Sequence, residues 1–291
     1  MSEIVNLYND KISVGISTYG AELTYIRDEN GIPVLWERDE LEWTSSAPVL
    51  FPICGRLQNN KYYYDGQWYS MDIHGFAKKS EFQVVKRSNT NIEFVLNASS
   101  ETKQCYPFDF VFHIIYEIYG TELKISYIVE NHSDGILPFS VGSHEGYYCP
   151  DGIGEYYVEF YHDDQPVDCT KYVSFANRTS KEILMNGNHL ELEDSYFEDD
   201  LLVFKNITFN RVVLGCKKDK RKIELTIDNG ESFLIWSKSG AHFVCLEPWY
   251  GIQRWGCTDE DYDFDIMRKE GIHLLGVGEQ FTVAHRISVI D

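Results

Sequence analysis

The stretch Glu122-Leu-Lys-Ile-Ser-Tyr-Ile-Val-Glu130 alternates apolar and polar side chains, so every second residue from Leu123 to Val129 lies on one face of an extended strand. Turn signals such as Asp228-Asn-Gly230 separate segments of this kind. The pattern predicts half-buried antiparallel strands in a large β-sandwich or barrel. The same period of two recurs in residues 11–17, 91–97, 222–228, 232–237 and 280–289.

No long segment keeps a helical period of 3.6, although short helical turns are expected around Glu37–Trp43 and Ser180–Leu184. The chain also has no internal repeat, no low-complexity stretch and no linker rich in proline and glycine. An all-β chain of 291 residues can remain one domain. We therefore expect residues 1–291 to form a single all-β domain.

The composition excludes several classes of partner. With 46 acidic and 26 basic residues, the net charge of −20 repels nucleic acid and anionic membrane surfaces but is indifferent to a neutral small molecule. The densest basic run, Lys217-Lys-Asp-Lys-Arg-Lys222, is interpreted as an exposed turn of a hairpin.

The N-terminal residues carry no signal-peptide pattern, and no apolar stretch approaches the roughly 18 residues of a membrane span. The seven cysteines are scattered without CxxC spacing, which is typical of free thiols in a cytoplasmic protein. Neither the cysteines nor the histidines show metal-ligand spacing, so no metal is expected. Motifs for nucleotide cofactors and serine hydrolases are also missing, so we expect no cofactor.

Two polar residues interrupt apolar segments in the first third of the chain. Arg56 ends the run Ala47-Pro-Val-Leu-Phe-Pro-Ile-Cys-Gly55, where its guanidinium could serve a cavity or pair structurally with a carboxylate. His74 precedes Gly75 in Met71-Asp-Ile-His-Gly-Phe-Ala77, where it could contact a ligand or be a satisfied core residue. The sequence leaves both choices open.

Two further segments carry stronger candidates. His144 lies between Gly142 and Gly146, which suits a rigid turn beside a pocket. Glu247 ends an apolar stretch, where burial would raise the pKa of its carboxyl and make it a better base near neutral pH. The following Trp249 and Tyr250 offer the kind of aromatic surface on which sugars stack. A structural ion pair between Glu247 and Arg56 is the alternative.

In order and spacing, these motifs resemble the aldose 1-epimerase (galactose mutarotase-like) family, and in particular the bacterial branch typified by the protein of lactose operons. The resemblance covers nearly the whole chain. The motifs that carry it are Gly20-Ala-Glu-Leu23, Pro33-Val-Leu-Trp36, Phe51-Pro-Ile-Cys-Gly-Arg-Leu57, His74-Gly-Phe-Ala77, Gly142-Ser-His144 and Leu246-Glu-Pro-Trp-Tyr-Gly251.

The resemblance implies an antiparallel β-supersandwich that binds an aldohexose and interconverts its anomers without a cofactor. It implies that Glu247 is the general base and His144 the general acid, and that Arg56 and His74 contact the sugar. An acidic substrate-binding position of the family corresponds loosely to Asp200. With the aromatic interpretation above, Trp249 completes the expected substrate-binding residues.

One departure and two alternatives remain. Many mutarotases read Gly-Arg-x-x-Asn-Arg where this chain reads Gly55-Arg-Leu-Gln-Asn-Asn60, which puts a preference for galactose in doubt. An epimerase of a phosphorylated hexose would need further cations, for which Lys61 and Arg254 are the sequence candidates. A carbohydrate-binding protein without turnover is the non-enzyme alternative, although it would not need an acid–base pair. The sequence does not indicate the oligomeric state.

Overall fold

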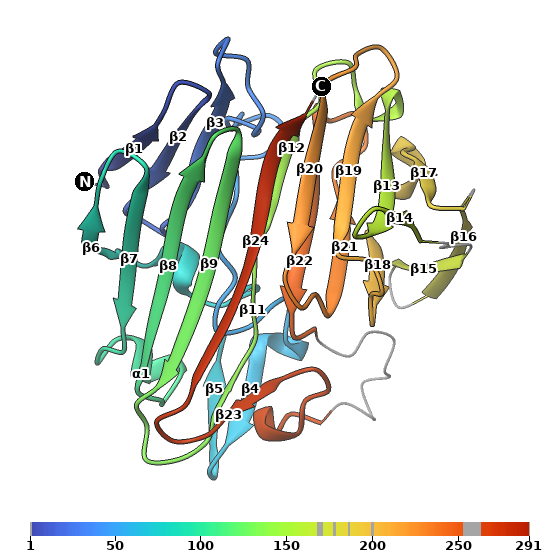
Figure 1. Cartoon of the computed structure of the whole chain (residues 1–291). Coiled ribbons are helices and arrows are strands. Elements are labelled where there is room, and N and C mark those ends of the chain that lie inside the picture. Colours follow the sequence, from blue (N-terminus) through green and yellow to red (C-terminus); the bar gives the residue numbers. More distant parts are fainter. Residues whose placement is uncertain are drawn as a thin grey trace.

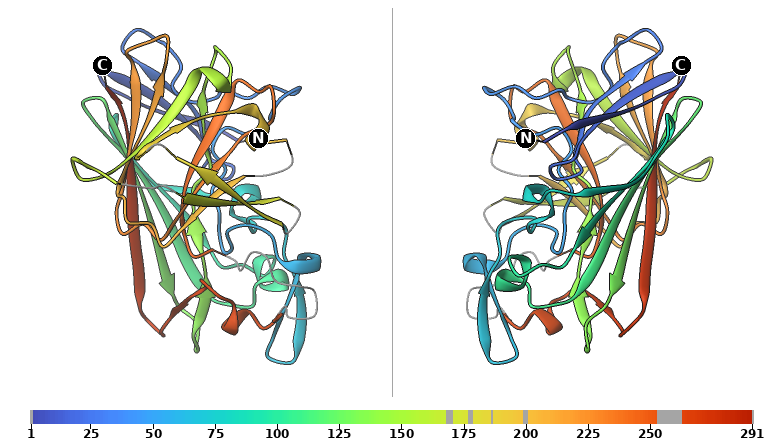
Figure 2. Two further views of the ribbon diagram at one scale, coloured as in Figure 1. Left: turned by 90° about the vertical axis from the view of Figure 1, so that its right-hand side faces the viewer. Right: turned by 90° about the vertical axis from the view of Figure 1, so that its left-hand side faces the viewer.

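The computed structural model describes residues 2–167, 171–176, 179–185, 187–198, 201–252 and 263–290. Within these ranges, two large antiparallel sheets dominate the architecture (Figure 1). Seen from the side, they form the layers of a sandwich (Figure 2). The all-β antiparallel architecture predicted from the alternating pattern and the sandwich implied by the resemblance are thus confirmed.

The larger sheet has ten strands within the described residues. Its path runs in the order β14 (Gln165–Pro166), β13 (Tyr156–His162), β19 (Arg211–Cys216), β20 (Lys222–Ile227), β24 (Gln280–Ile290), β9 (Glu122–Asn131), β8 (Phe110–Tyr119), β7 (Asn91–Asn97) and β6 (Gln83–Arg87), and β17 (His189–Glu191) also pairs with β13.

The smaller sheet has seven strands in the described part of the chain. Two short strands, β11 (Val141–Gly142) and β12 (Glu145–Tyr148), pair with the same edge of β22 (Phe243–Tyr250). The sheet continues through β21 (Ser232–Trp236), β18 (Leu202–Lys205), β15 (Lys171–Ala176) and β16 (Thr179–Leu184).

Smaller elements complete the described fold. The remaining strands form three short sheets: β1 (Ile4–Tyr8), β2 (Ile12–Ser17) and β3 (Leu23–Asp28); β4 (Lys61–Tyr64) and β5 (Gln67–Ser70); and β10 (Leu137–Phe139) with β23 (His273–Leu275). The described residues also include one short α-helix, α1 (Thr102–Cys105). Separate 3-10 turns lie at Gln58–Asn60, Ala77–Lys79, Ile153–Glu155, Asp194–Tyr196 and Ile266–Arg268. None of the described helices has the length and apolarity that a membrane crossing requires.

The alternating segments form strands as predicted. In β9, the residues at alternate positions from Leu123 to Val129 are buried, and the strand pairs with β8 on one side and β24 on the other. Their apolar side chains enter one large cluster that also contains Val244 and Leu246 of the smaller sheet. Burial of this apolar surface between the layers is the main force that holds the sheets together.

Two local expectations have different outcomes. The basic run from Lys217 to Lys222 lies between β19 and β20, which pair as an antiparallel hairpin, as predicted. The helical turn expected around Ser180–Leu184 is wrong, because these residues belong to β16 and pair with β15. Pairing with a neighbouring strand outweighs weak local helix preference in such a short segment.

The segment before Phe51 runs beside the short strands of the smaller sheet. The backbone N–H of Trp36 donates to the carbonyl of Gly146 at 2.8 Å, and that of Leu50 donates to Gly142 at 3.0 Å. These hydrogen bonds hold the intervening residues, including Trp43, close to His144. A segment distant in sequence thereby becomes part of the candidate site.

Candidate active site

The strand β22 separates the core from the candidate site. Successive side chains of a strand point to opposite faces. Accordingly, Val244 and Leu246 belong to the main core cluster, whereas Cys245 and Trp249 belong to small clusters on the other face. Glu247 is at an odd-numbered position between them and therefore faces away from the larger sheet.

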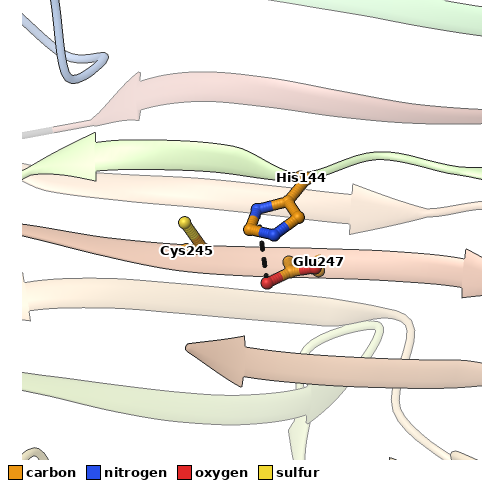
Figure 3. Close-up of side chains that lie close together, drawn as sticks. All are labelled: His144, Cys245 and Glu247. Atoms are coloured by element: carbon orange, nitrogen blue, oxygen red, sulfur yellow. Dashed lines mark ion pairs between the residues drawn. The ribbon is translucent and has the colours of Figure 1, made fainter. Parts of the chain in front are cut away.

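His144 and Glu247, the two residues predicted as the acid–base pair, lie together in the structure. The Nδ1 atom of His144 is 3.4 Å from Oε1 of Glu247, and the side chains are only 11% and 2% exposed (Figure 3). The separation is slightly longer than an ideal hydrogen bond. Catalytic contacts are often long before substrate binds, so this geometry suits a pair that exchanges protons with a ligand.

Glu247 is fixed by a second contact. The indole N–H of Trp249 donates to its Oε2 atom at 3.1 Å. Trp249 is only 2% exposed, so its ring is packed inside the protein and does not offer an open surface for stacking. The idea that Trp249 and Tyr250 form one aromatic surface is wrong, because Tyr250 points into the core and donates to the carbonyls of Asp228 and Ala284.

The two glycines that flank His144 leave room for aromatic rings. A Cβ atom at Gly142 would lie 2.9 Å from Cδ1 of Trp249, and one at Gly146 would lie 2.7 Å from Cζ3 of Trp43. Both distances are too short for a side chain. The two glycines were interpreted from the sequence as signs of a rigid turn, but they lie in β11 and β12 and make room for the rings by their small size.

Trp43 and Trp236 surround the imidazole of His144. Their ring centroids lie 5.2 and 5.5 Å from its centroid, respectively. Both tryptophans are partly exposed, in contrast to Trp249. They are aromatic surfaces beside His144 and Glu247 that were not identified from the sequence.

His74 connects two of the sequence motifs. Its ring atom Nδ1 accepts a hydrogen bond from the backbone N–H of Gly55 at 3.0 Å, and the backbone N–H of His74 donates to the carbonyl of Gly55 at 2.7 Å. Its ring lies 5.4 Å from that of His144 and 5.6 Å from that of Trp249. The next residue must be glycine, since a Cβ at Gly75 would lie 2.2 Å from the Phe51 carbonyl oxygen.

Arg56 is exposed, and its Nη1 atom donates to Oδ1 of Asn60 at 3.2 Å. Asn60 occupies the position at which many mutarotases have their second arginine. The guanidinium therefore contacts the residue that marks the departure from the family pattern. Asp200, the remaining predicted site residue, lies outside the described residues.

Burial controls the charge of the central groups. Desolvation raises the pKa of the Glu247 carboxyl, while the hydrogen bond from Trp249 partly opposes this rise. Desolvation lowers the pKa of His144 to about 3. It also lowers the pKa of His74, and the neighbouring His144 adds to this effect. Burial of the site thus favours a protonated carboxyl and neutral imidazoles.

Lys78 is a further group that the sequence analysis missed. It lies on the turn directly after the His74 motif, and burial lowers the pKa of its ammonium. Its charge in turn lowers the pKa values of His74 and His144. A partly buried cation that acts on both histidines is an element of the site's electrostatics.

One group of side chains could hold a metal ion. Potential ligand atoms of His144, Cys245 and Glu247 lie within 4.8 Å of one another. Linear spacing alone predicted no metal, because β22 and the segment before β12 meet only through strand pairing.

Comparison with known proteins identifies the family. The model of the aldose 1-epimerase family matches residues 3–262. The chain belongs to the aldose 1-epimerase family. Among curated relatives of this aldose 1-epimerase family member, the chromosomally encoded protein LacX of Lactococcus lactis subsp. lactis is 28% identical over 262 residues, or 85% of this chain and 88% of LacX.

Solved structures agree with this membership in the aldose 1-epimerase family. A galactose mutarotase related enzyme from Lactobacillus acidophilus is 28% identical and superposes with a TM-score of 0.88 over 99% of this chain and 98% of the other. A galactose mutarotase-like protein from Lactobacillus casei gives a TM-score of 0.90 at 22% identity over 99% and 100% of the two chains, which supports the fold. The protein is thus an isomerase of the aldose 1-epimerase type, with a sugar as its substrate.

Proposed function

We propose that the protein interconverts the α and β anomers of an aldohexose, with Glu247 and His144 as its acid–base pair. The observation that carries this proposal is the buried contact of 3.4 Å between the two side chains. Mutarotation needs one group that takes the proton from the C1 hydroxyl and one that protonates the ring oxygen. The ring then opens, the C1–C2 bond rotates, and closure reverses both transfers.

The charge state of the pair is compatible with these roles. A carboxylate with an imidazolium and a carboxylic acid with a neutral imidazole contain the same number of protons, so one can convert into the other by a single transfer. Burial favours the neutral form of the pair. Sugar hydroxyls that donate to Glu247 would favour its ionised form, in which Glu247 is the base and His144 the acid.

The surrounding residues take supporting roles in this proposal. Trp249 orients Glu247 through its indole N–H. The ring of His74 lies nearly perpendicular to that of His144, and Trp43 and Trp236 provide partly exposed faces for the apolar side of the sugar. Arg56 contributes a fixed fork of donors for hydroxyl groups.

Polarimetry or NMR exchange with freshly dissolved α-glucose and α-galactose tests the proposal. We expect the protein to accelerate anomeric equilibration, and Glu247→Gln and His144→Asn each to lose about 10²–10⁴-fold in rate. The exposed pair Glu130 and His132, 2.8 Å apart, offers matched controls that should retain full activity as Glu130→Gln and His132→Asn. Unchanged rates in both site variants would refute the assignment. Sugar binding without acceleration by the wild type would favour a binding protein.

A phosphorylated hexose is the second candidate substrate, and Lys78 is the observation that favours it. This cation acts electrostatically on both site histidines and lies close enough to Arg56 for their charges to interact. Lys61, a candidate from the sequence, has its ammonium 4.7 Å from the ring centroid of Trp68, while Arg254 lies outside the described residues.

The substrates can be distinguished by comparing kcat/KM for glucose and glucose 6-phosphate. If the phosphate is recognised, Lys78→Ala should reduce kcat/KM for the phosphorylated sugar selectively. Lys79→Ala is the control, since Lys79 pairs with Asp72 on the exposed surface at 2.6 Å. Equal losses for both sugars, or a preference for unmodified glucose in the wild type, would reject this candidate.

A further inference from the structure

Cys245 lies two residues before Glu247 on β22, so both side chains face the same side of the strand. Its side chain is fully buried in a small cluster with Phe243 and Trp36, outside the main core. The proposed proton transfers do not use its thiol. The structure nevertheless places it beside the acid–base pair (Figure 3).

The three side chains form a compact set of donors. A ring nitrogen of His144, the Cys245 sulfur and a Glu247 oxygen all lie within 4.8 Å of one another. Around a tetrahedral zinc ion with the usual bond lengths, ligand atoms are about 3.3–3.8 Å apart, so modest side-chain rotations would bring these atoms into position. Although Nδ1 of His144 lies 3.4 Å from Oε1 of Glu247, the two atoms are not aligned for a hydrogen bond, and among the described residues this buried nitrogen has no other hydrogen-bond partner.

We propose that His144, Cys245 and Glu247 bind a soft divalent cation such as Zn²⁺ or Cd²⁺. A thiolate and an imidazole favour these ions over Mg²⁺ and Ca²⁺, which prefer oxygen ligands. Three protein ligands leave the fourth tetrahedral position to water.

The charge balance suits a buried position. On binding, the thiol releases its proton to solvent, and the carboxyl does the same if it carries one. One thiolate and one carboxylate then neutralise the two positive charges, and the imidazole binds in its neutral form. A neutral complex avoids the high cost of an uncompensated charge in a nonpolar environment.

Bound metal would inhibit the enzyme. This part of the inference rests on the proposed function, in which Glu247 and His144 must exchange protons with the sugar. Coordination occupies the same carboxylate oxygen and ring nitrogen, so neither could act as acid or base. The protein would thus be sensitive to soft metal ions and insensitive to magnesium, and sugar and metal would compete.

Direct titration tests the metal site without reference to activity. Purified protein, kept reduced with a phosphine, is titrated with Cd²⁺ or Co²⁺ while the thiolate-to-metal absorption band is recorded. We expect saturation at one equivalent in the wild type. Cys245→Ser should abolish the band and weaken Zn²⁺ binding, measured by calorimetry, by more than about the 10–100-fold that second-shell changes produce. The control Cys216→Ser, which changes a buried thiol on β19 of the larger sheet, should keep both.

The second test measures how Zn²⁺ inhibits the anomeric equilibration of the sugar. Cys245→Ser and Cys245→Ala should retain basal activity and resist Zn²⁺, whereas Cys216→Ser should remain sensitive. A thiolate band or Zn²⁺ affinity unchanged in both Cys245 variants would overturn the metal site, whatever the activity. If the wild type binds metal at Cys245 but accelerates no sugar, the proposed function fails and the metal site stands.

Discussion

The Glu145 carboxylate lies 3.0 Å from Nε2 of His285, and this contact joins β12 of the smaller sheet to β24 of the larger sheet. The two side chains are 2% and 0% exposed. Glu145 directly follows His144, yet it points into the core while His144 points into the candidate site. Glu145, the residue that follows the proposed acid His144, therefore links the two sheets of the sandwich.

Loss of this buried pair should be costly. We expect His285→Ala to lower the free energy of unfolding by about 3–5 kcal/mol, because it leaves the Glu145 carboxyl buried and without its partner. Urea denaturation followed by tryptophan fluorescence measures the change. His132→Ala, which removes one partner of an exposed pair, should cost no more than about 1 kcal/mol. Equal small losses in the two variants would show that the buried pair contributes little to stability.

The catalytic rate should depend on pH as a broad bell. The acid limb marks binding of a second proton to the pair, and burial lowers the pKa of His144 to about 3, so the limb should lie well below the ordinary imidazole value of 6.5. The alkaline limb marks loss of the pair's last proton, and burial raises the pKa of Glu247, so it should lie above 4.5. Measurements of kcat/KM, corrected for spontaneous mutarotation, test this. An acid limb near 6.5 would contradict it.

Glu145 should influence the alkaline limb. Its charge contributes to the raised pKa of Glu247, so neutralising it in Glu145→Gln should lower that pKa and move the limb to lower pH. Glu130→Gln, a change of the same charge at the surface, should leave the profile in place. An unmoved limb in Glu145→Gln, in protein that remains folded, would restrict Glu145 to a structural role.

The buried histidines should make the fold sensitive to acid. Burial lowers the pKa values of His74 and His144, so below 6.5 the unfolded chain binds protons that the folded protein does not. Their contribution to stability is fully present above pH 6.5 and is lost as the pH falls below it, for His144 down to a pKa of about 3, at up to about 1.4 kcal/mol per pH unit for each group.

His74→Asn tests this sensitivity, because an amide oxygen can still accept from the N–H of Gly55 but does not titrate. We expect urea unfolding of the variant to show a shallower decline in stability across the acid window. His132→Asn, at an exposed site, should follow the wild type. A wild-type slope in His74→Asn would mean that His74 is not held neutral.

The space beside His144 should be intolerant of added methyl groups. Gly146→Ala would place a Cβ 2.7 Å from Trp43, so we expect a loss of about 1–3 kcal/mol in stability and slower equilibration as the rings shift. Gly135→Ala, where an added Cβ meets nothing within 4 Å, is the control. Thermal unfolding and polarimetry measure both effects, and wild-type behaviour of Gly146→Ala would disprove the close packing.

Local patterns predicted the strands and the central pair. Alternation identified β9 and β24, and the unusual placement of a carboxylate in an apolar stretch identified Glu247. The same alternation, applied to β22, would also have placed Cys245 beside Glu247 and Tyr250 in the core. Residues 243–247 were instead interpreted as one apolar stretch and Trp249 and Tyr250 as one aromatic surface, so both assignments were missed.

Other site residues depend on long-range packing. Trp43 and Trp236 reach His144 from segments about 100 residues away on either side, and no periodicity relates them. The contact between Arg56 and Asn60 is local, but only the backbone of the turn brings the two side chains together. Interactions of this kind follow from the assembled sheets rather than from any single segment.

All eight residues of β22 are buried. Even-numbered positions face the core and odd-numbered positions face the candidate site, so a larger or charged side chain at any position of the strand would disturb one or the other. In a saturation mutagenesis screen, residues 243–250 should therefore appear as an uninterrupted block of intolerance to large and charged side chains. Selection for sugar turnover would act on the odd-numbered residues and selection for folding on the even-numbered ones, so this strand should change more slowly in evolution than its neighbours.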